Sequence, residues 1–225
     1  MIPLEGAASW DCDATDLIVN EGDLIFTGAG ESNESTALGI FSEIPPRLLP
    51  DVDACIGNFF GEGATYDEFV TDTDEKQEGA FSLRSTVSVD ASQEQFAGWF
   101  VSWEICDLAG DNSIVRDMSL FENGRMLLWV KTPIDLEVGI RSGNVSPGFE
   151  TSKIRLSDIN PLVIDDNWHL VCVPLSPFRG VAPNADFTQI KVFFVIASNV
   201  ATGGTGGLPA TFWVDHVRWE AGGCP

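Results

Sequence analysis

Residues 117–140, DMSLFENGRMLLWVKTPIDLEVGI, decide the fold class of this chain. Residues 127–130 form a short apolar run, and residues 136–140 alternate between apolar side chains and Glu or Gly. Alternation with a period of two is typical of a strand with one buried face and one solvated face. Pro133 interrupts any strand ladder between the two runs. The segment therefore predicts two core strands with a short connection.

Residues 211–219, TFWVDHVRW, supply the expected partner strand. This run again alternates, and it is apolar apart from a few positions. One of these is Asp215, a carboxylate inside a predicted core strand. Burying a carboxylate is costly unless another group pairs with it. Asp215 is therefore the first candidate for a functional residue.

The charge balance narrows the class of partner. The chain has 12 basic and 34 acidic residues and a formal net charge of −22. No nucleic-acid partner is expected, because binding to nucleic acid depends on neutralising phosphates with Lys and Arg. Anionic polysaccharides and membranes are disfavoured unless a cation bridges, whereas calcium suits carboxylate-rich surfaces. A second interpretation, that the charge serves solubility alone, stays open.

The cysteines leave the redox state open. They are Cys12, Cys55, Cys106, Cys172 and Cys224. Without a CxxC spacing, a cysteine-based zinc site is not expected, and both two disulfides with a free thiol and buried reduced cysteines fit the count. No apolar stretch is long enough to span a membrane. The start, MIPLEGAASW, lacks signal-peptide features, and we expect a secreted chain whose signal is missing, with an intracellular chain as the alternative.

The remaining pattern predicts an all-β fold. Residues 1–50 are expected to form an N-terminal extension, possible extra strands of the same sandwich, that ends in a proline-rich connection; residues 51–225 form the main domain. Strands are expected at 17–19, 24–27, 38–41, 81–89, 96–105, 153–156, 168–174 and 187–196, and an acidic loop at 67–78. About ten short strands with Gly and Pro turns predict an antiparallel β-sandwich or jelly roll.

Five segments in order carry a family resemblance. They are DMSLFENGRMLLWVKTP, LEVGIRSGN, NWHLVCVPLSPF, DFTQIKVFFVI and TFWVDHVRW. This set resembles the carbohydrate-binding modules with a galactose-binding-like β-sandwich, which are often attached to glycan-degrading enzymes. The resemblance covers roughly residues 55–220 and leaves the first 50 residues outside. It implies a polysaccharide or oligosaccharide ligand and a catalytic domain of a larger enzyme as a partner.

The same resemblance implies a structural calcium ion (Ca²⁺) beside the first and last strands. It assigns Asp215 as a ligand, with the carbonyl of Gly79 and with Asn58 or Glu62. Calcium binds six to eight oxygens from carboxylates and carbonyls, so the chemistry agrees. The alternatives are that Asp215 faces water at a sheet edge or pairs with an arginine.

A sugar site needs flat aromatic rings and a few oriented polar groups. Trp99 and Trp103 are two residues apart and therefore lie on one face of a predicted strand. With Arg141 on a neighbouring strand and Asn144 and Tyr66 on flanking loops, they are the candidate carbohydrate-binding residues. The alternative is that strand tryptophans fill the core. That position is expected outright for Trp129, Trp168, Trp213 and Trp219.

These observations predict non-catalytic binding of a neutral polysaccharide of plant, algal or microbial origin. A glycan-cleaving enzyme is the weaker alternative, because hydrolysis needs two carboxylates facing one cleft and Glu104 and Asp107 follow no such pattern. An extracellular structural or adhesive subunit, assembled through residues 1–50, is the other alternative.

Overall fold

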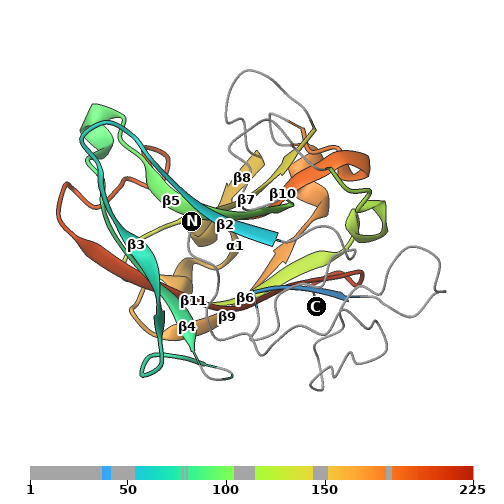
Figure 1. The fold of residues 1–225 in the computed structure, drawn as a ribbon, viewed down its shortest axis with the longest axis horizontal. Helices are drawn as coiled ribbons and strands as arrows, with labels where there is room; N and C mark the ends of the chain where they lie inside the picture. Colours follow the sequence, from blue (N-terminus) through green and yellow to red (C-terminus); the bar gives the residue numbers. More distant parts are fainter. Residues whose placement is uncertain are drawn as a thin grey trace.

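Two antiparallel β-sheets pack face to face in the computed structural model of the protein (Figure 1). The structure describes residues 37–41, 54–77, 79, 81–103, 115–143, 152–180 and 184–224. Helices in these ranges are single turns, and none has the length and apolar character to cross a membrane. They are α1 (Leu156–Ile159) and the 3-10 turns η1 (Ala91–Gln93), η2 (Ser119–Phe121), η3 (Pro161–Val163), η4 (Ser176–Arg179) and η5 (Phe187–Gln189). The predicted all-β sandwich is confirmed.

The first sheet, here called the β11 sheet, is built around the C-terminal strand. Its order is β3 (Thr65–Asp72), β4 (Ser82–Ser88), β11 (Ala210–Glu220), β6 (Arg125–Lys131) and β9 (Trp168–Pro174), and β1 (Ala37–Phe41) also pairs with β11. The second, the β10 sheet, has the order β2 (Ala54–Phe60), β5 (Ala97–Trp103), β10 (Ile190–Ser198), β7 (Glu137–Ser142) and β8 (Ser152–Arg155). The strands expected at 17–19 and 24–27 lie outside the described residues.

The segment 117–140 connects the two sheets. Its first strand, β6, pairs with β11 in the register Val130 to Val214, which confirms the expected partner. Its second strand, β7, pairs with β10 in the other sheet. The residues between them carry the chain across the sandwich, and the hydroxyl of the buried Thr132 donates to the carbonyl of Ile134 at 2.7 Å.

The inner faces of both sheets form one core. Trp99 packs against Phe194 with ring centroids 5.1 Å apart, and Trp219 packs edge-on against Phe121 at 5.9 Å. These four side chains are essentially inaccessible to solvent. The core position expected for Trp219 is confirmed. The same prediction was wrong for three other tryptophans. These side chains are partly exposed on the outer face of the β11 sheet: Trp129, Trp168 and Trp213.

A bulge in β11 brings a strand of the N-terminal region into the sheet. β4 pairs with β11 up to Val214, and β1 pairs with the same edge from Val217 onward. The register against β6 shifts between Asp215 and Arg218, and His216 has a φ of +48°. A bulge of this kind bends a strand and re-aims its side chains. The expected strand at 38–41 therefore belongs to the main sheet.

Two strands were not predicted as strands. β2, ACIGNFF, has an interior glycine, and β3, TYDEFVTD, carries three acidic residues. Both features lower the local preference for a strand. The expected acidic loop at 67–78 was wrong for residues 67–72, which pair with β4.

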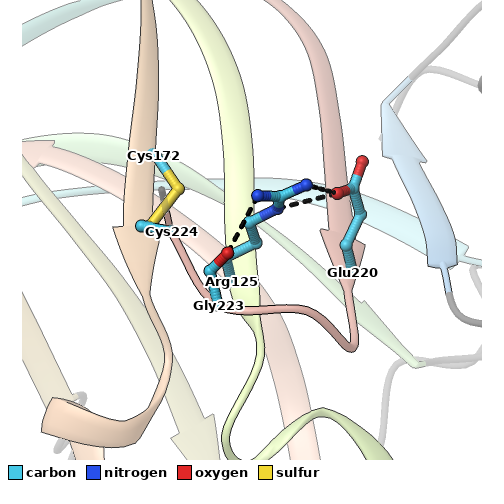
Figure 2. Close-up of a disulfide and its surroundings, with 5 residues drawn as sticks. All are labelled: Arg125, Cys172, Glu220, Gly223 and Cys224. Carbon is cyan, nitrogen blue, oxygen red and sulfur yellow. Dashed lines mark hydrogen bonds and ion pairs between the residues drawn. A yellow bond between two sulfur atoms is a disulfide. The ribbon is translucent and has the colours of Figure 1, made fainter.

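A disulfide joins the C-terminal tail to an edge strand of the β11 sheet (Figure 2). Cys172 of β9 is bonded to Cys224, which follows β11. Arg125 of β6, beside them, donates to Glu220 at 2.7 Å through Nε and to the carbonyl of Gly223 at 2.9 Å through Nη1. These contacts hold the tail across the ends of three strands. The side chains of the other cysteines lie outside the described residues.

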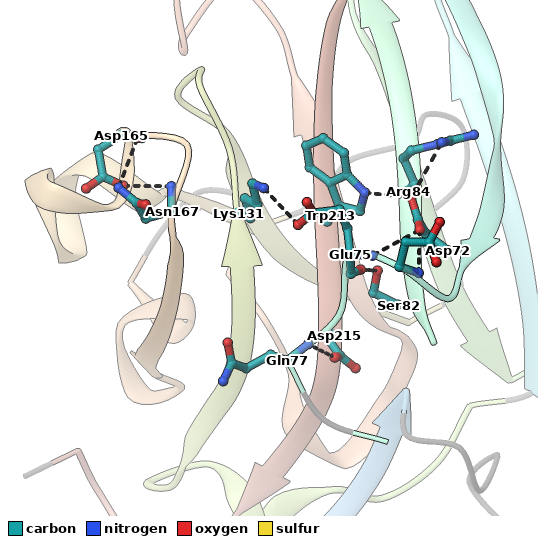
Figure 3. Close-up of polar contacts among 11 residues, drawn as sticks. Asp72, Glu75, Gln77, Ser82, Arg84, Lys131, Asp165, Asn167, Trp213 and Asp215 are labelled. Atoms are coloured by element: carbon teal, nitrogen blue, oxygen red, sulfur yellow. Dashed lines mark hydrogen bonds and ion pairs between the residues drawn. The ribbon is translucent and has the colours of Figure 1, made fainter. Parts of the chain in front are cut away.

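The turn after β3 folds over the outer side of β11 (Figure 3). Asp72 accepts hydrogen bonds from the backbone N–H groups of Asp74 and Glu75, at 3.0 and 3.1 Å, and from the indole of Trp213 at 3.1 Å. Farther along, the N–H of Gln77 donates to Asp215 at 2.9 Å. The turn is thus tied to β11 at two points.

The protein is expected to lose stability in acid because the pKa values of Asp72 and Glu220 are lowered in the folded state. Burial raises the pKa of Asp72, but hydrogen bonds from Glu75, Trp213 and Asp74 outweigh it and the net shift is downward. Burial likewise raises the pKa of Glu220, and hydrogen bonds from Arg218 and Arg125 outweigh it.

A folded-state pKa below the unfolded value contributes stability that is complete above the unfolded pKa and is lost as pH falls through the folded pKa. We therefore expect the urea midpoint to drop between pH 5 and pH 3. The Glu220→Gln variant should show a smaller drop than the wild type. An unchanged wild-type midpoint over this range would contradict the assignment.

Candidate functional site

The β10 sheet has a face that points away from the core. Directly paired residues of an antiparallel sheet lie on the same face. Trp99 pairs with Ile196, and both are fully buried in the core. The next pair along these strands, Phe100 with Val195, therefore lies on the opposite side. We call this side the β10 outer face.

The middle of the β10 outer face holds the side chain of Val195, between Phe100 and Gly139, and four residues with little or no side chain. They are Gly57, Gly98, Gly139 and Ala197, each paired with a residue of the same face. A Cβ atom at Gly98 would lie 2.1 Å from the carbonyl oxygen of Ile196, so no larger residue fits without movement. Glycine in a strand interior often marks the close approach of another backbone, and at Gly98, a buried residue, that backbone belongs to β10.

Aromatic rings border this floor on the side of β2 and β5. Phe59 pairs with Gly98, and Phe100 pairs with Gly57, so both belong to the outer face. The ring centroids of Phe59 and Phe100 are 6.4 Å apart, and Phe96 continues the row at 6.1 Å from Phe59. Phe96 is 42% exposed, and the other two rings are half-buried. The three rings form a partly solvent-accessible aromatic strip.

Hydrogen-bonding groups border the floor on the side of β7 and β8. Glu137 pairs with Ala197, and Lys153 pairs with Gly139. The carboxylate of Glu137 accepts a hydrogen bond from the side-chain amide of Asn199 and lies 3.3 Å from Nζ of Lys153. Glu137 is only 9% exposed, so this pair is held in place by its surroundings.

Two arginines extend the polar border. Arg141 of β7 pairs with Val192, whose neighbour in β5 is Ser102 of the outer face, and Arg141 is half-buried. Arg155 of β8 pairs with Glu137, and its guanidinium binds Asp158 at 2.8 and 3.1 Å. Aromatic rings on one side and oriented polar groups on the other suit a ligand with apolar faces and hydroxyl-bearing edges.

A family model described as carbohydrate binding domain 30 matches residues 53–221. The chain belongs to carbohydrate binding domain family 30. The match spans both sheets and includes every strand except β1. No curated protein sequence matches this family 30 domain.

Solved family 30 modules share the fold. The module of a cellulosomal cellulase from Clostridium thermocellum aligns with a TM-score of 0.56 and 16% identity, over 81% of this chain and 96% of that one. Two further crystal structures of family 30 modules align with TM-scores of 0.57 and 0.56 and identities of 16% and 18%. They cover 81% and 84% of this chain, and 97% and 89% of their own chains. At these identities the likeness extends to the fold alone.

Trp99 is not a ligand-binding residue of this family 30 domain. Its side chain has no solvent exposure and packs in the core against Phe194. The prediction that Trp99 is a carbohydrate-binding residue was therefore wrong. The alternation in β5 separates the two faces correctly, but the tryptophan face is the buried one. Phe100, on the other alternation, lies on the outer face.

Of the other predicted sugar-binding residues, Arg141 and Tyr66 are placed by the structure, and they lie in different sheets. Arg141 is on the β10 outer face, and its role there stays a prediction. Tyr66 lies in β3 of the other sheet, paired with Val87, so its expected place on a flanking loop was wrong. Trp103 is in β5 with its side chain outside the described residues, and Asn144 lies wholly outside them.

The predicted calcium ligands also separate. Asp215 pairs with Trp129 on the outer side of the β11 sheet, whereas Asn58 pairs with Trp99 in the β10 sheet, on the other side of the core. Glu62 precedes the first residue of β3. The last residues of β3, at the opposite end of the strand, lie across β4 from the part of β11 that contains Asp215. A strand of this length covers roughly 23 Å. Asn58 and Glu62 therefore cannot share an ion with Asp215.

Asp215 contacts a residue close to Gly79 in the sequence. The carboxylate of Asp215, in a residue that is 3% exposed, accepts the Gln77 N–H, and Gly79 follows two residues later with a φ of +66°. Among the described residues no group of three or more His, Cys, Asp or Glu side chains could hold a metal. Any ion here would depend on backbone carbonyls beside the one carboxylate.

Sequence reasoning missed Phe59, Phe100, Glu137 and Lys153. Phe59 is in β2, which was not predicted as a strand, so its face could not be assigned. Glu137 and Lys153 are 16 residues apart in the sequence and meet through the pairing of β7 with β8. The alternation of Phe100 with Trp99 was the one available signal.

Proposed function

We propose that this domain binds a neutral polysaccharide on the β10 outer face without cleaving it. The observation that carries the proposal is the aromatic strip of Phe59, Phe96 and Phe100, which lies across a glycine-rich floor from Glu137 and Lys153. Pyranose rings have apolar C–H faces and hydroxyl edges. The strip offers stacking partners, and the polar border offers donors and acceptors.

The net charge supports a neutral ligand. A formal charge of −22 repels uronate-rich or sulfated chains at long range, and salt screens this repulsion only partly. Two of the nearby cations, Lys153 and Arg155, are each paired with a carboxylate, which weakens their attraction for an anionic chain. Neutral β-glucans, xylans and mannans are therefore the ligand class we propose.

Affinity electrophoresis tests the proposal. We expect migration to be retarded in gels that contain a neutral β-glucan, xylan or mannan, with little retardation in polygalacturonate at equal salt. Incubation with the retarding polysaccharide should release no reducing sugar. Retardation by polygalacturonate alone would overturn the ligand class, and product release would support the enzyme alternative instead.

We also propose that the domain is secreted and works beside a catalytic domain. The Cys172–Cys224 bond supports an oxidising compartment, because disulfides are rare in reducing cytosol. Membership of a carbohydrate-binding family supports attachment to an enzyme that acts on the bound glycan. An assembly subunit would instead elute well above the 24.3 kDa of a monomer in size-exclusion chromatography.

We propose that calcium binds between Asp215 and the carbonyl of Gly79. The buried carboxylate and the turn that passes beside it support this smaller site. A bound calcium ion would supply a cross-link between β11 and Gly79. At a hundredfold excess over its Kd it would add about 2.7 kcal/mol to the free energy of unfolding.

Thermal melts test the calcium proposal. For a domain of this size, that energy corresponds to a Tm shift of about 5–10 °C. EDTA should lower Tm by this amount, added calcium should restore it, and the Asp215→Asn variant should be insensitive to both. An identical wild-type Tm with and without EDTA would rule the site out and leave the glycan proposal intact.

A further inference from the structure

The outer face of the β11 sheet carries a block of four large side chains. Trp168 of β9 pairs with Lys131 of β6, and Leu170 pairs with Trp129. Paired residues, and residues two apart in a strand, share a face. The intervening Val130 is fully buried in the core, so the block points away from it. We call these four residues the Trp168 block.

The Trp168 block is open to solvent. Leu170 is 45% exposed, and both tryptophans are partly exposed. In the part of the chain that the structure describes, β9 is the last strand of its sheet, so the block can also be reached from the side. Clustered large apolar side chains on a solvent face mark a binding surface more often than single exposed ones.

A fixed polar border runs along the block. Nζ of Lys131 is 2.8 Å from a carboxylate oxygen of Glu75 and 4.9 Å from the ring centroid of Trp213 (Figure 3). Trp213 is held in turn by its hydrogen bond to Asp72. A ligand would therefore meet charged groups that are already ordered, which lowers the entropy cost of binding.

We propose that the Trp168 block is a second glycan-binding surface, on the sheet opposite the β10 outer face. The indoles of Trp129 and Trp168 and the side chain of Leu170 would pack against the C–H faces of neutral pyranose rings. The Lys131–Glu75 pair would receive their hydroxyl groups. Nothing in this argument depends on whether the β10 outer face binds sugar.

The size and charge of the surface favour a glycan over a protein partner. Stable protein interfaces bury about 800 Å² on each partner, whereas a Trp side chain buries at most about 250 Å², so two partly buried indoles and one leucine provide far less. A second copy of the chain would bring another −22 charges. A short stretch of sugar rings needs only a small contact area and, being uncharged, is not repelled by the chain.

Binding on two opposite sheets has a consequence for the whole domain. One molecule could hold two polysaccharide chains, or two segments of one chain. Linked contacts of this kind raise the overall affinity for a multivalent ligand without new contacts at either site.

Titration calorimetry tests the proposal, with β-linked glucose and xylose hexasaccharides as probes. We expect two sites per wild-type chain, one of which should weaken in the Trp168→Ala variant. In a Phe59→Ala/Phe100→Ala background, the remaining site should weaken roughly tenfold on the Trp168→Ala change. Trp168→Phe should restore part of that loss. Leu170→Ala, at an exposed position, should also weaken the remaining site and provides the test if Trp168→Ala does not fold.

Other results would overturn the inference. One site per wild-type chain, or two sites that Trp168→Ala and Leu170→Ala leave unchanged, would exclude a glycan at the block. A wild-type dimer that Trp168→Ala converts to a monomer would assign the block to self-association instead. If the wild type has one site and Phe59→Ala/Phe100→Ala abolishes it, the function proposed for the β10 outer face stands and this inference falls.

Discussion

Replacing Phe59 and Phe100 together by alanine is expected to weaken glycan binding at the β10 outer face at least about a hundredfold. The two rings are 6.4 Å apart beside a floor of glycines, so a sugar chain that crosses the floor contacts both. Truncating an aromatic side chain at the centre of a binding site typically costs about 2 kcal/mol or more, which is more than tenfold in affinity. Titration calorimetry with a neutral glucan hexasaccharide measures this loss, in a Trp168→Ala background that weakens any binding at the Trp168 block.

Phe60→Ala is the matched control. Phe60 follows Phe59 in β2 and is 57% exposed, but it falls on the other alternation and pairs with Ala97. We expect its affinity to stay within about threefold of the parent, since exposed positions outside an interface contribute little. Equal losses for Phe60→Ala and the double variant would point to a general structural effect. Unchanged affinity in the double variant would contradict the site.

Replacing Cys172 and Cys224 together by serine is expected to lower the free energy of unfolding by about 4 kcal/mol. The bond joins residues 52 apart in the sequence, and loop-closure entropy for that length gives this value. The C-terminal tail would then be held mainly by Arg125, which donates to Glu220 and to the carbonyl of Gly223 (Figure 2). Urea unfolding, followed by tryptophan fluorescence, measures the loss.

Arg125→Met with the disulfide intact serves as the control. It removes the ion pair with Glu220 and should cost much less, because partly exposed ion pairs contribute about 1 kcal/mol or less. Glycan affinity at the β10 outer face should survive both changes, since the disulfide belongs to the other sheet. A double serine variant as stable as the parent would show that the tail is not held by this bond.

The fold class followed from alternation because most strands here bury one face. β4 and β11 have this pattern, and both were predicted within two residues of their ends. β2 and β3 were missed for a physical reason. Their glycine and acidic residues lower the local preference for a strand, and pairing with β5 and β4 in the folded chain overrides it.

The candidate site was harder to predict because alternation separates two faces without saying which is buried. In β5 the larger tryptophan lies in the core and the phenylalanine outside. In β6 and β9 the opposite holds, and Trp129 and Trp168 lie on an outer face. Only the pairing of distant strands resolves this, and the same applies to Glu137 with Lys153. The predicted metal ligands failed for the same reason. Asn58 and Asp215 lie in different sheets, and only the strand pairing shows this.

Amide chemical shifts in a glycan titration test the central claim most directly. If a neutral glucan hexasaccharide binds across the glycine floor, the backbone amides of Gly57, Gly98 and Gly139 should shift together, with one affinity, in β2, β5 and β7. Saturating ligand that leaves all three amides unshifted would contradict binding on the β10 outer face.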